Sequence, residues 1–470
     1  MRETLERELK LAPGEGFVLP ELGGERLPER VFISTYHDTD DLRLAPYGVT
    51  LRHRIENGTG LWQLKLPRGS ARLELEVAGQ ASRPPVELVE LLPAYLRGRE
   101  LVPVARLRTR RETIRASGAE IVDDSVSVLE GQRVARRFRE IEIELVGGDE
   151  RDLRRLVKAM RRSGAIEQGP LRPKLHRALD IPAPAPPATI ERETSPGSAL
   201  AIALSREYRS LLVHDPGTRR GVDPEDLHQL RVATRRARAF LRAAAALVEK
   251  EWAVSLREEL GWLGGHLGPA RDLDVMRARL SGEVVALERD ADGAASLLVA
   301  LEDEREASYR DVVEVLRDPR YFMLLEQLEA AATPPLSGDE TTLASVFHRE
   351  AKRMRRTFAA LGETPADDEL HASRIAVKRA RYAADLAAHE LGRPGERFVT
   401  IAKDLQDILG DHQDAVFAEA RIRAWAASDP AGAFAAGRLV QLERDRKAAA
   451  RLAWPAVWER LDEAARRAVR

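Results

Sequence analysis

The chain has 470 residues, 44% of them hydrophobic, so it is long enough for about three domains and too apolar for a disordered protein. Lys and Arg number 75 against 76 Asp and Glu, so net charge supports neither a generally basic nucleic-acid binder nor an acidic partner. The absence of Cys excludes disulfides and thiolate metal sites.

The amino terminus, MRETLERELKL, is charged where a secretory signal would be apolar. No run approaches the roughly 18 consecutive apolar residues of a membrane span. Together with the lack of Cys, these features lead us to expect a cytoplasmic protein that does not enter a membrane.

Residues 1–180 are predicted to consist mainly of β-strands. Alternation of apolar and polar residues marks strands at Leu5–Leu11, Val31–Tyr36, Val49–Arg54, Leu61–Leu66, Arg72–Val77 and Arg139–Leu145. Turn signals such as Asn57-Gly58 and Gly147-Gly148 lie between or after these runs. Shorter helices are expected at Pro85–Leu96 and Glu150–Arg162.

Charged side chains of both signs alternate with apolar ones on these strands. One face carries Glu6, Glu8, Lys10, Arg52, Arg54, Gln63, Lys65, Arg72, Glu74, Glu76, Glu140, Glu142 and Glu144. On any one strand, a half-exposed sheet with its charges facing water would give this pattern. Its repetition on five strands, with helices available to cover the apolar side, favours a closed antiparallel β-barrel with a charged lumen and flanking helices.

A linker and a helical unit follow. Residues 181–197 are predicted to form a semi-rigid linker, because Pro182–Pro187 reads PAPAPP. Residues 198–470 are rich in Ala, Leu, Arg and Glu, with helical periodicity interrupted at Asp215–Gly221, Asp318–Pro319, Pro334–Gly338, Thr364–Pro365, Gly392–Gly395 and Asp429–Gly432. Asp223 and Thr364, each followed by Pro, are expected N-caps. The chain is therefore predicted to be an α+β multidomain protein whose C-terminal part is an all-α bundle.

A cationic helix is predicted at Leu227–Arg242, LHQLRVATRRARAFLR, which holds five Arg and no acid. On a helical wheel His228, Arg231, Arg235, Arg238 and Arg242 fall within an arc of roughly 80°. The opposite side of the wheel carries Leu230, Ala233, Ala237 and Leu241. The segment Leu370–Arg381, LHASRIAVKRAR, repeats the pattern, with His371, Arg374, Lys378 and Arg381 in the same arc.

The repeat extends beyond one helix. Leu267–Asp272 reads LGPARD and Leu409–Asp414 reads LGDHQD, at nearly the offset that separates the two cationic helices. Two elements repeating at one period predict an internal duplication around a pseudo-twofold axis. Such an axis would bring the two cationic fronts to one groove.

The cationic groove suits phosphate oxygens, because guanidinium groups bind them through several N–H donors. The alternative is an ordinary solvated helix face, but no acid interrupts either arc and we expect no ion-pair partners at i+4. Aromatic residues make up 5% of the chain and are not interleaved with the arginines, which disfavours nucleic acid. A metal at the histidines is disfavoured because no carboxylate stands at i+3 or i+4 from either. We therefore expect a polyanion without bases.

The helical half resembles the CHAD family, the conserved histidine α-helical domain, over about residues 195–465. The segments that carry the resemblance are LHQLRVATRRARAF, LHASRIAVKRARY, LGPARDLD and LGDHQDAV. It implies a helical fold that binds inorganic polyphosphate along a basic groove. The residues that match the family's motif positions are His228, Arg231, Arg235, Arg236, His371, Arg374, Lys378 and Arg379. In the second copy Gln413 stands where the first has Arg271.

The strand region contains two charged motifs that suit a divalent metal. Glu6-x-Glu8-x-Lys10 places two carboxylates and an ammonium on one face, and Glu140-x-Glu142-x-Glu144 places three carboxylates. Mg²⁺ and Mn²⁺ are bound by a few carboxylates together with phosphate oxygens. The segments ERELK, YHDTDDLRL, LRHR, WQLKL, RLELE, DDSV and REIEIEL resemble the CYTH family, or triphosphate tunnel metalloenzymes, over residues 1–180. The resemblance implies a closed tunnel of eight antiparallel strands and chemistry on a triphosphate.

By that resemblance, Glu6, Glu8 and Lys10 would form the catalytic set. The metal, Mg²⁺ or Mn²⁺, would be held by Glu6, Glu8, Glu140, Glu142 and Glu144. Phosphate oxygens would be bound by Lys10, Arg52, Arg54, Lys65 and either Arg110 or Arg111, of which Arg111 is preferred, with Lys174 as a further candidate. Arg72, Glu74 and Glu76 match the family as ion-pair partners.

The two resemblances together predict an inorganic triphosphatase, or short-chain polyphosphatase, joined to a module that binds inorganic polyphosphate and could localise to polyphosphate granules. Adenylyl cyclase or thiamine triphosphatase activity in the tunnel is an alternative within the enzymes. A non-catalytic polyphosphate-binding protein is an alternative of another class, and a nucleic-acid scaffold is the most distant.

Overall fold

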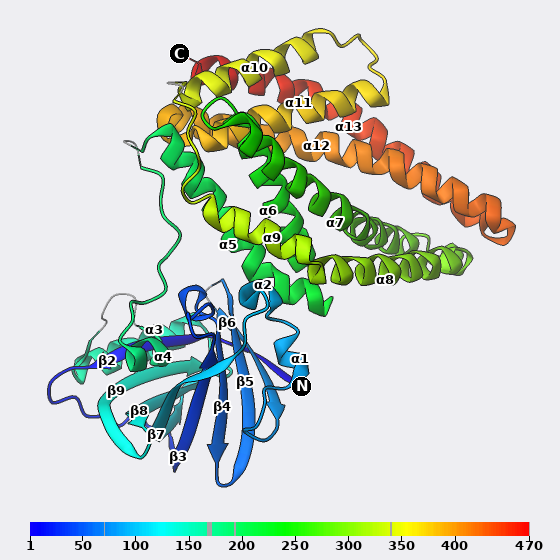
Figure 1. Cartoon of the computed structure of the whole chain (residues 1–470). Helices are drawn as coiled ribbons and strands as arrows, with labels where there is room; N and C mark the ends of the chain where they lie inside the picture. The colour runs from blue at the N-terminus through cyan, green and yellow to red at the C-terminus, as the bar shows by residue number, and fades with distance from the viewer. Residues whose placement is uncertain (70, 167–171, 192–193, 339–340, 470) are drawn as a thin grey trace. The chain divides into compact units, whose positions relative to one another are not determined.

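The computed structural model describes residues 1–69, 71–166, 172–191, 194–338 and 341–469. The chain divides into two compact units, Met1–Pro186 and Pro187–Arg470 (Figure 1). The boundary between the units falls inside the proline run Pro182–Pro187.

The N-terminal unit is built on one antiparallel sheet of ten strands, in the order β1-β6-β5-β4-β3-β7-β8-β9-β2-β10 (Figure 1). The strands are β1 (Arg2–Glu6), β2 (Glu8–Pro13), β3 (Glu25–Asp38), β4 (Thr50–Glu56), β5 (Thr59–Arg68), β6 (Ala71–Ala78), β7 (Val102–Ala116), β8 (Ala119–Glu130), β9 (Arg133–Leu145) and β10 (Ala165–Ile166). The helices of this unit are α1 (Val86–Val89), α2 (Pro93–Leu96), α3 (Glu150–Arg162) and α4 (Lys174–Leu179), with a 3₁₀ turn at Ala45–Tyr47.

The sheet is not closed. β1 and β2 follow one another with Arg7 alone between them, yet β1 pairs with β6 and β2 pairs with β9. Among the described residues no ladder joins the two ends of the strand order, so the predicted closed barrel is not confirmed. The two ladders place Glu6 opposite Arg72 and Glu8 opposite Glu144.

The sequence patterns predict some elements of this unit better than others. The helix expected at Glu150–Arg162 is confirmed as α3, which Asp149 caps by accepting from the backbone N–H groups of its first turn. The helix expected at Pro85–Leu96 is wrong as a single element, because Pro93 starts a second short helix, α2. No prediction covered β7 and β8, although both are long and central.

The apolar residues of the strands lie on both sides of the sheet. On the outer face, Leu156 and Met160 of α3 pack with Ile121, Ile141 and Ile143 into one buried core. At one end of the inner face, α4 packs against a second buried group from β3, β7 and β8. Together these helices cover apolar parts of the sheet and leave charged positions of the inner face around a space.

The C-terminal unit is all-helical, as predicted. Its helices are α5 (Pro196–Arg220), α6 (Pro224–Ala243), α7 (Lys250–Val285), α8 (Ala295–Arg317), α9 (Pro319–Ala330), α10 (Leu343–Ala359), α11 (Asp367–Leu386), α12 (Ala388–Ser428) and α13 (Ala433–Ala468). Two of the expected boundaries are wrong. Helix α5 continues through Asp215 to Arg220 with Pro216 inside it, and Ala366 rather than Thr364 is the N-cap of α11.

The packing of the helices follows the predicted duplication. Helices α5 to α8 pack each against the next, and so do α10 to α13, while α6 contacts α11 where the two sets meet. On α6, Leu230, Ala233, Ala237 and Leu241 are fully buried, which confirms the apolar back expected from the helical wheel. Within the part of the chain that the structure describes, no helix has the length and apolarity needed to cross a membrane.

Candidate functional site: a charge-lined cavity and a cationic groove

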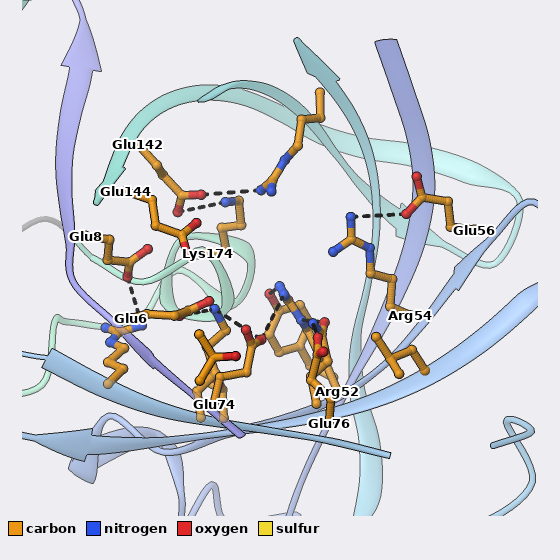
Figure 2. Close-up of a pocket in the computed structure, with 18 of the residues that line it drawn as sticks. Glu6, Glu8, Arg52, Arg54, Glu56, Glu74, Glu76, Glu142, Glu144 and Lys174 are labelled. Carbon is orange, nitrogen blue, oxygen red and sulfur yellow. Dashed lines mark hydrogen bonds and ion pairs between the residues drawn. The ribbon is translucent and has the colours of Figure 1, made fainter. Parts of the chain in front are cut away.

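A cavity of about 620 Å³ lies against the inner face of the sheet (Figure 2). Among the described residues its lining includes nine cationic side chains: Arg2, Lys10, Arg30, Arg52, Arg54, Lys65, Arg72, Arg111 and Lys174. It includes eight acidic ones: Glu6, Glu8, Glu56, Glu74, Glu76, Glu120, Glu142 and Glu144. The alternating charged positions therefore surround a common space, and several of them are nine-tenths buried, which excludes the open, water-facing sheet considered above.

The carboxylates of β1, β2, β6 and β9 meet at one end of this cavity (Figure 2). The Nζ atom of Lys65 lies 2.5 Å from Glu6 Oε2 and 3.4 Å from Glu74 Oε1. Glu144 makes no ion pair with another described residue. Burial raises the pKa of Glu144 to about 7, and the neighbouring carboxylates of Glu6 and Glu8 add to the rise. Burial also raises the pKa of Glu6.

This acidic end has the donor chemistry of a divalent-metal site. Carboxylate oxygens are the ligands that Mg²⁺ and Mn²⁺ prefer. Glu6, Glu8 and Glu144 supply them, and burial together with the neighbouring carboxylates raises the pKa of Glu144. In the described residues no three acidic or His side chains are already gathered into a metal site. The carboxylates at this end fit a hard divalent cation by their chemistry.

Arginines from β3, β4 and β7 line the other part of the cavity. The guanidinium carbon of Arg54 lies 3.6 Å from the ring centroid of Phe32. Its Nε and Nη2 atoms are buried and make no hydrogen bond to any residue that the structure describes, although Glu56 Oε2 is 3.2 Å from Nη2. Burial, followed by the charges of Arg52 and Arg111, lowers the pKa of Arg54 to about 9. Arg54 therefore presents buried N–H groups that could donate hydrogen bonds to an anion in the cavity.

A network of buried ion pairs lies beside the acidic end. Lys174 Nζ is 2.8 Å from Asp124 Oδ2, 2.8 Å from Glu140 Oε1 and 2.9 Å from Glu142 Oε1. Lys10 Nζ contacts the same two glutamates, 3.3 Å from Glu140 Oε1. Burial opposes the charge on Glu142, but the two lysines hold the pKa of its carboxyl well below its usual range. Glu140 is 2% exposed and is not among the lining residues, so its predicted metal role stays a prediction.

Sequence reasoning assigned no role to Arg30, Glu56 and Asp124, although the segment DDSV, which carries part of the family resemblance, includes Asp124. Arg30 Nε lies 2.6 Å from Glu56 Oε1, and both residues line the cavity. Asp124 is fully buried and accepts from Arg111 Nε at 2.8 Å. Arg30 would have been indicated by extending the strand predicted at Val31–Tyr36 back by one residue, and Glu56 by extending the strand predicted at Val49–Arg54 forward by two. Asp124 would have been indicated by recognising β8 as a strand.

The cationic fronts of α6 and α11 meet in a groove of about 250 Å³, as the duplication predicts. Its described lining contains six cations, Arg235, Arg238, Arg242, Arg257, Lys378 and Arg379, and one acid, Glu350. The buried Nε atoms of Arg257 and Arg379 have no hydrogen-bond partner among the described residues. This excess of cations, part of it without partners, makes the groove a site for an anion, which we call the cationic groove.

Lys378 has the most perturbed environment in the cationic groove. Burial lowers its pKa to about 7, and the charges of Arg374, Arg235 and Arg231 lower it further. Burial also lowers the pKa of Arg374, in spite of the nearby Asp414. The amine of Lys378 is thus held among like charges that an anionic ligand would offset.

The predicted polyphosphate-binding residues do not all point into this groove. Arg235, Lys378 and Arg379 line it, whereas His228, Arg231, Arg236, His371 and Arg374 do not. Arg231 Nη1 pairs with Asp272 Oδ1 at 2.9 Å, and Arg236 Nε pairs with Glu207 Oε1 at 3.1 Å. The expectation that acids are missing at i+4 is wrong for Arg381, which lies 3.6 Å from Asp385. The roles of all eight residues stay predictions.

The fold and the two sites define a protein with a charge-lined sheet cavity in one unit and a cationic groove in the other. Comparison with known proteins finds a CYTH domain at residues 4–170 and a CHAD domain at residues 202–423. An uncharacterized protein of Mycobacterium tuberculosis (strain CDC 1551 / Oshkosh) is 30% identical, over 99% of this chain and 98% of its own. The chain therefore belongs to the family of proteins that fuse a CYTH domain to a CHAD domain, as the sequence motifs predicted. Both CYTH and CHAD assignments are thereby confirmed.

Two solved structures are also similar to parts of the chain. PptA from Streptomyces chartreusis is 23% identical, covering 56% of this chain and 99% of its own, with a TM-score of 0.49. The CHAD domain from the plant Ricinus communis is 24% identical, covering 64% of this chain and 97% of its own, with a TM-score of 0.47.

Proposed function

We propose that the N-terminal unit hydrolyses inorganic triphosphate, or a short polyphosphate, with Mg²⁺ or Mn²⁺, and that the helical unit binds inorganic polyphosphate. The observation that carries the first part is the cavity, in which carboxylates that fit a metal stand at one end and buried arginines at the other. A triphosphate needs both kinds of group, because its oxygens bind the cationic side chains of the protein and also the metal ion that the carboxylates would hold. β1 pairs with β6 and β2 pairs with β9, and Arg7 alone separates β1 from β2. These two consecutive strands would thereby connect the two sides of the sheet into a tunnel around this substrate.

The chain's own residues would orient the phosphate chain. Arg52, Arg54 and Arg111 would hold its non-bridging oxygens and offset the charge that develops as the terminal P–O bond breaks. Arg52 is already oriented, since its Nε donates to Gln63 Oε1 at 2.8 Å and its Nη1 donates to Tyr36 Oη at 3.2 Å. Glu6, Glu8 and Glu144 would hold the metal. When bound, the metal would neutralise phosphate charge and lower the pKa of the attacking water.

The lining favours an inorganic substrate over a nucleotide. Its one aromatic residue, among those described, is Tyr36, whose hydroxyl is engaged by Arg52. A purine or thiamine ring would find no second ring to stack on there. Inorganic triphosphate needs no such platform.

The helical part of the proposal is supported by the cationic groove. Six cations with one acid attract an anion of high charge density, and guanidinium groups suit phosphate oxygens. Tyr382 is the single aromatic residue in the described lining, so the groove offers little for base stacking.

Phosphate release from tripolyphosphate, measured with Mg²⁺ and with Mn²⁺, tests the first part. We expect Glu6→Ala and Glu8→Ala to abolish release. Glu3 is exposed on β1, on the face opposite to Glu6, and we expect Glu3→Ala to leave release unchanged. Wild-type activity in the Glu6 and Glu8 variants would refute the assignment. A panel of tripolyphosphate, long polyphosphate, thiamine triphosphate and ATP then identifies the preferred substrate.

Binding of long-chain polyphosphate tests the second part. We expect it to weaken with salt and to fall strongly when Arg231, Arg235, Arg374 and Lys378 are all replaced by Ala. If RNA bound the protein as tightly as polyphosphate does, the nucleic-acid alternative would replace the proposal.

A further inference from the structure

A second concave surface lies on the outer face of the same sheet. It encloses about 890 Å³ between side chains of β3, β7, β8 and β9. Its lining carries five arginines, Arg106, Arg108, Arg110, Arg137 and Arg139, which we call the outer arginine face. It is distinct from the charge-lined cavity, because Arg106, Arg108 and Arg110 alternate along β7 with residues that turn inward, such as Leu107 and Arg111.

Strand register arranges this face in two parallel rows. Ser127 of β8 stands opposite Arg108 on one side and Arg137 on the other. The next row repeats the arrangement, since Ser125 stands opposite Arg110 and Arg139. Neighbouring strands are about 4.8 Å apart and successive outward residues about 7 Å apart, so guanidinium groups flank a hydroxyl twice within a short distance.

Most of the positive charge on this face is not balanced by the protein. Arg110 Nη2 pairs with Glu29 Oε2 at 2.6 Å, and Arg139 Nη2 pairs with Asp123 Oδ2 at 2.5 Å. The side chains of Arg106, Arg108 and Arg137 are exposed and make no ion pair or hydrogen bond with any described residue. Elsewhere in the chain acids and bases are nearly equal in number, so three unpartnered arginines on one concave face are a local surplus.

We propose that the outer arginine face binds inorganic polyphosphate, as a third phosphate site outside both the cavity and the cationic groove. The inference rests on the proposed function for its choice of ligand. Guanidinium groups and Ser hydroxyls are the donors that proteins use for phosphate oxygens. Because the arginines extend along β7 and across to β9, they would contact several consecutive phosphates of a chain.

The composition of the face argues against ligands that contain bases. The one aromatic residue in its described lining is Phe138, which is partly buried and has the Arg177 guanidinium 4.1 Å from its ring centroid. No other ring is available on which a base could stack. A chain of phosphates without bases could accept hydrogen bonds from the donors on this face and would need no aromatic ring to stack on.

The test uses the full chain and long-chain polyphosphate over a salt series. The groove variant replaces Arg231, Arg235, Arg374 and Lys378 by Ala, and the face variant replaces Arg106, Arg108 and Arg137 by Ala. We expect the groove variant to retain weak, salt-sensitive binding. The combined variant, which carries both sets of substitutions, should bind polyphosphate at least tenfold more weakly than the groove variant. The slope of log affinity against log salt should fall by about two, since each phosphate contact contributes roughly 0.7–0.9.

A matched control removes the same number of charges elsewhere. In the groove variant, Arg151→Ala, Arg154→Ala and Lys158→Ala on the exposed side of α3 should leave the residual binding unchanged. Circular dichroism and thermal unfolding establish that each variant is folded. Exposed substitutions of this kind seldom change stability appreciably, so misfolding would not mimic the result.

Each other outcome overturns a specific part of the inference. A groove variant that binds nothing, or a combined variant that binds as well as the groove variant, would refute the outer arginine face alone. A wild-type protein that binds no polyphosphate would refute both this face and the proposed function of the helical unit. Equal binding of polyglutamate or single-stranded RNA by the groove variant would refute the assignment to a phosphate chain.

Discussion

Lys378 predicts how polyphosphate affinity depends on pH. In the free protein its pKa is lowered to about 7 by burial, by Arg374 and Arg381 on its own helix, and by two arginines of α6. A bound polyanion favours the charged ammonium and raises this pKa. Below pH 7 the lysine is protonated before and after binding, so affinity is at its full value. Above pH 7 binding requires uptake of a proton, and affinity falls as pH rises.

The size of the effect follows from the shift. The ordinary pKa of a lysine is 10.5, and the pKa of Lys378 in the free protein is about 7. If the bound ligand raises this pKa most of the way back to 10.5, affinity falls by up to tenfold for each pH unit above 7. Between pH 7 and pH 9 the expected loss is up to about 100-fold, or about 1.4 kcal/mol per unit.

Fluorescence anisotropy with labelled long-chain polyphosphate, at constant ionic strength from pH 6 to pH 9, measures the profile. Lys378→Arg is the matched variant, because a guanidinium keeps its charge over the whole range, and we expect its profile to be flat. A flat profile in the wild type, or a wild-type slope that persists in Lys378→Arg, would show that Lys378 is not the group that takes up the proton.

Three further predictions concern the packing of charged residues. Lys174→Ala removes one cation from three buried carboxylates, which keep their contacts to Lys10 and Arg111. Urea unfolding should show a loss of about 3–5 kcal/mol in the free energy of unfolding, and a loss below about 1 kcal/mol would contradict the network. A Cβ at Gly410 would lie 3.1 Å from Arg374 Nη2, whereas a Cβ at Gly268 would lie 3.9 Å from Nη2 of the equivalent Arg231. Gly410→Ala should therefore displace its arginine and weaken polyphosphate binding several-fold, and Gly268→Ala should not. Titration of both variants with polyphosphate tests this. Burial, with the nearby Glu443, raises the pKa of Glu283 to about 7. The folded state therefore holds this proton more tightly than the unfolded state, and stability falls as pH rises from about 4.5 to 7. Glu283→Gln should remove this decrease in thermal melts, and an unchanged decrease would exclude Glu283 as its source.

The sequence predicted that the two cationic helix faces meet, because helical periodicity fixes which residues share a face. Once α6 and α11 were recognised as copies, their contact followed from the duplication, and Arg235 and Lys378 indeed meet in one groove. Position on the wheel did not predict pairing across helices. Arg231 pairs with Asp272 of α7, and Arg236 pairs with Glu207 of α5, and neither contact is visible in a local pattern.

The sheet site was predicted less completely because strand pairing is non-local. Alternation correctly gave the inward face of Glu6, Arg52 and Lys65, since a strand has a strict period of two. It could not tell that Glu140 lies beneath the cavity, because that depends on Lys10 and Lys174 arriving from distant segments. The long strands β7 and β8 were missed, and with them the partner of Arg111.

The charge balance of the two sites points to different ligands. Nine cations and eight acids line the described part of the sheet cavity, so its net field is small, whereas six cations and one acid line the cationic groove. A nearly neutral cavity cannot attract a bare triphosphate by its net charge, but it suits a triphosphate whose charge is largely neutralised by divalent ions. The groove suits the opposite case, a bare polyanion without metal. Added Mg²⁺ should therefore promote turnover in the cavity and weaken polyphosphate binding in the groove, because metal bound to the chain reduces the charge that the arginines attract.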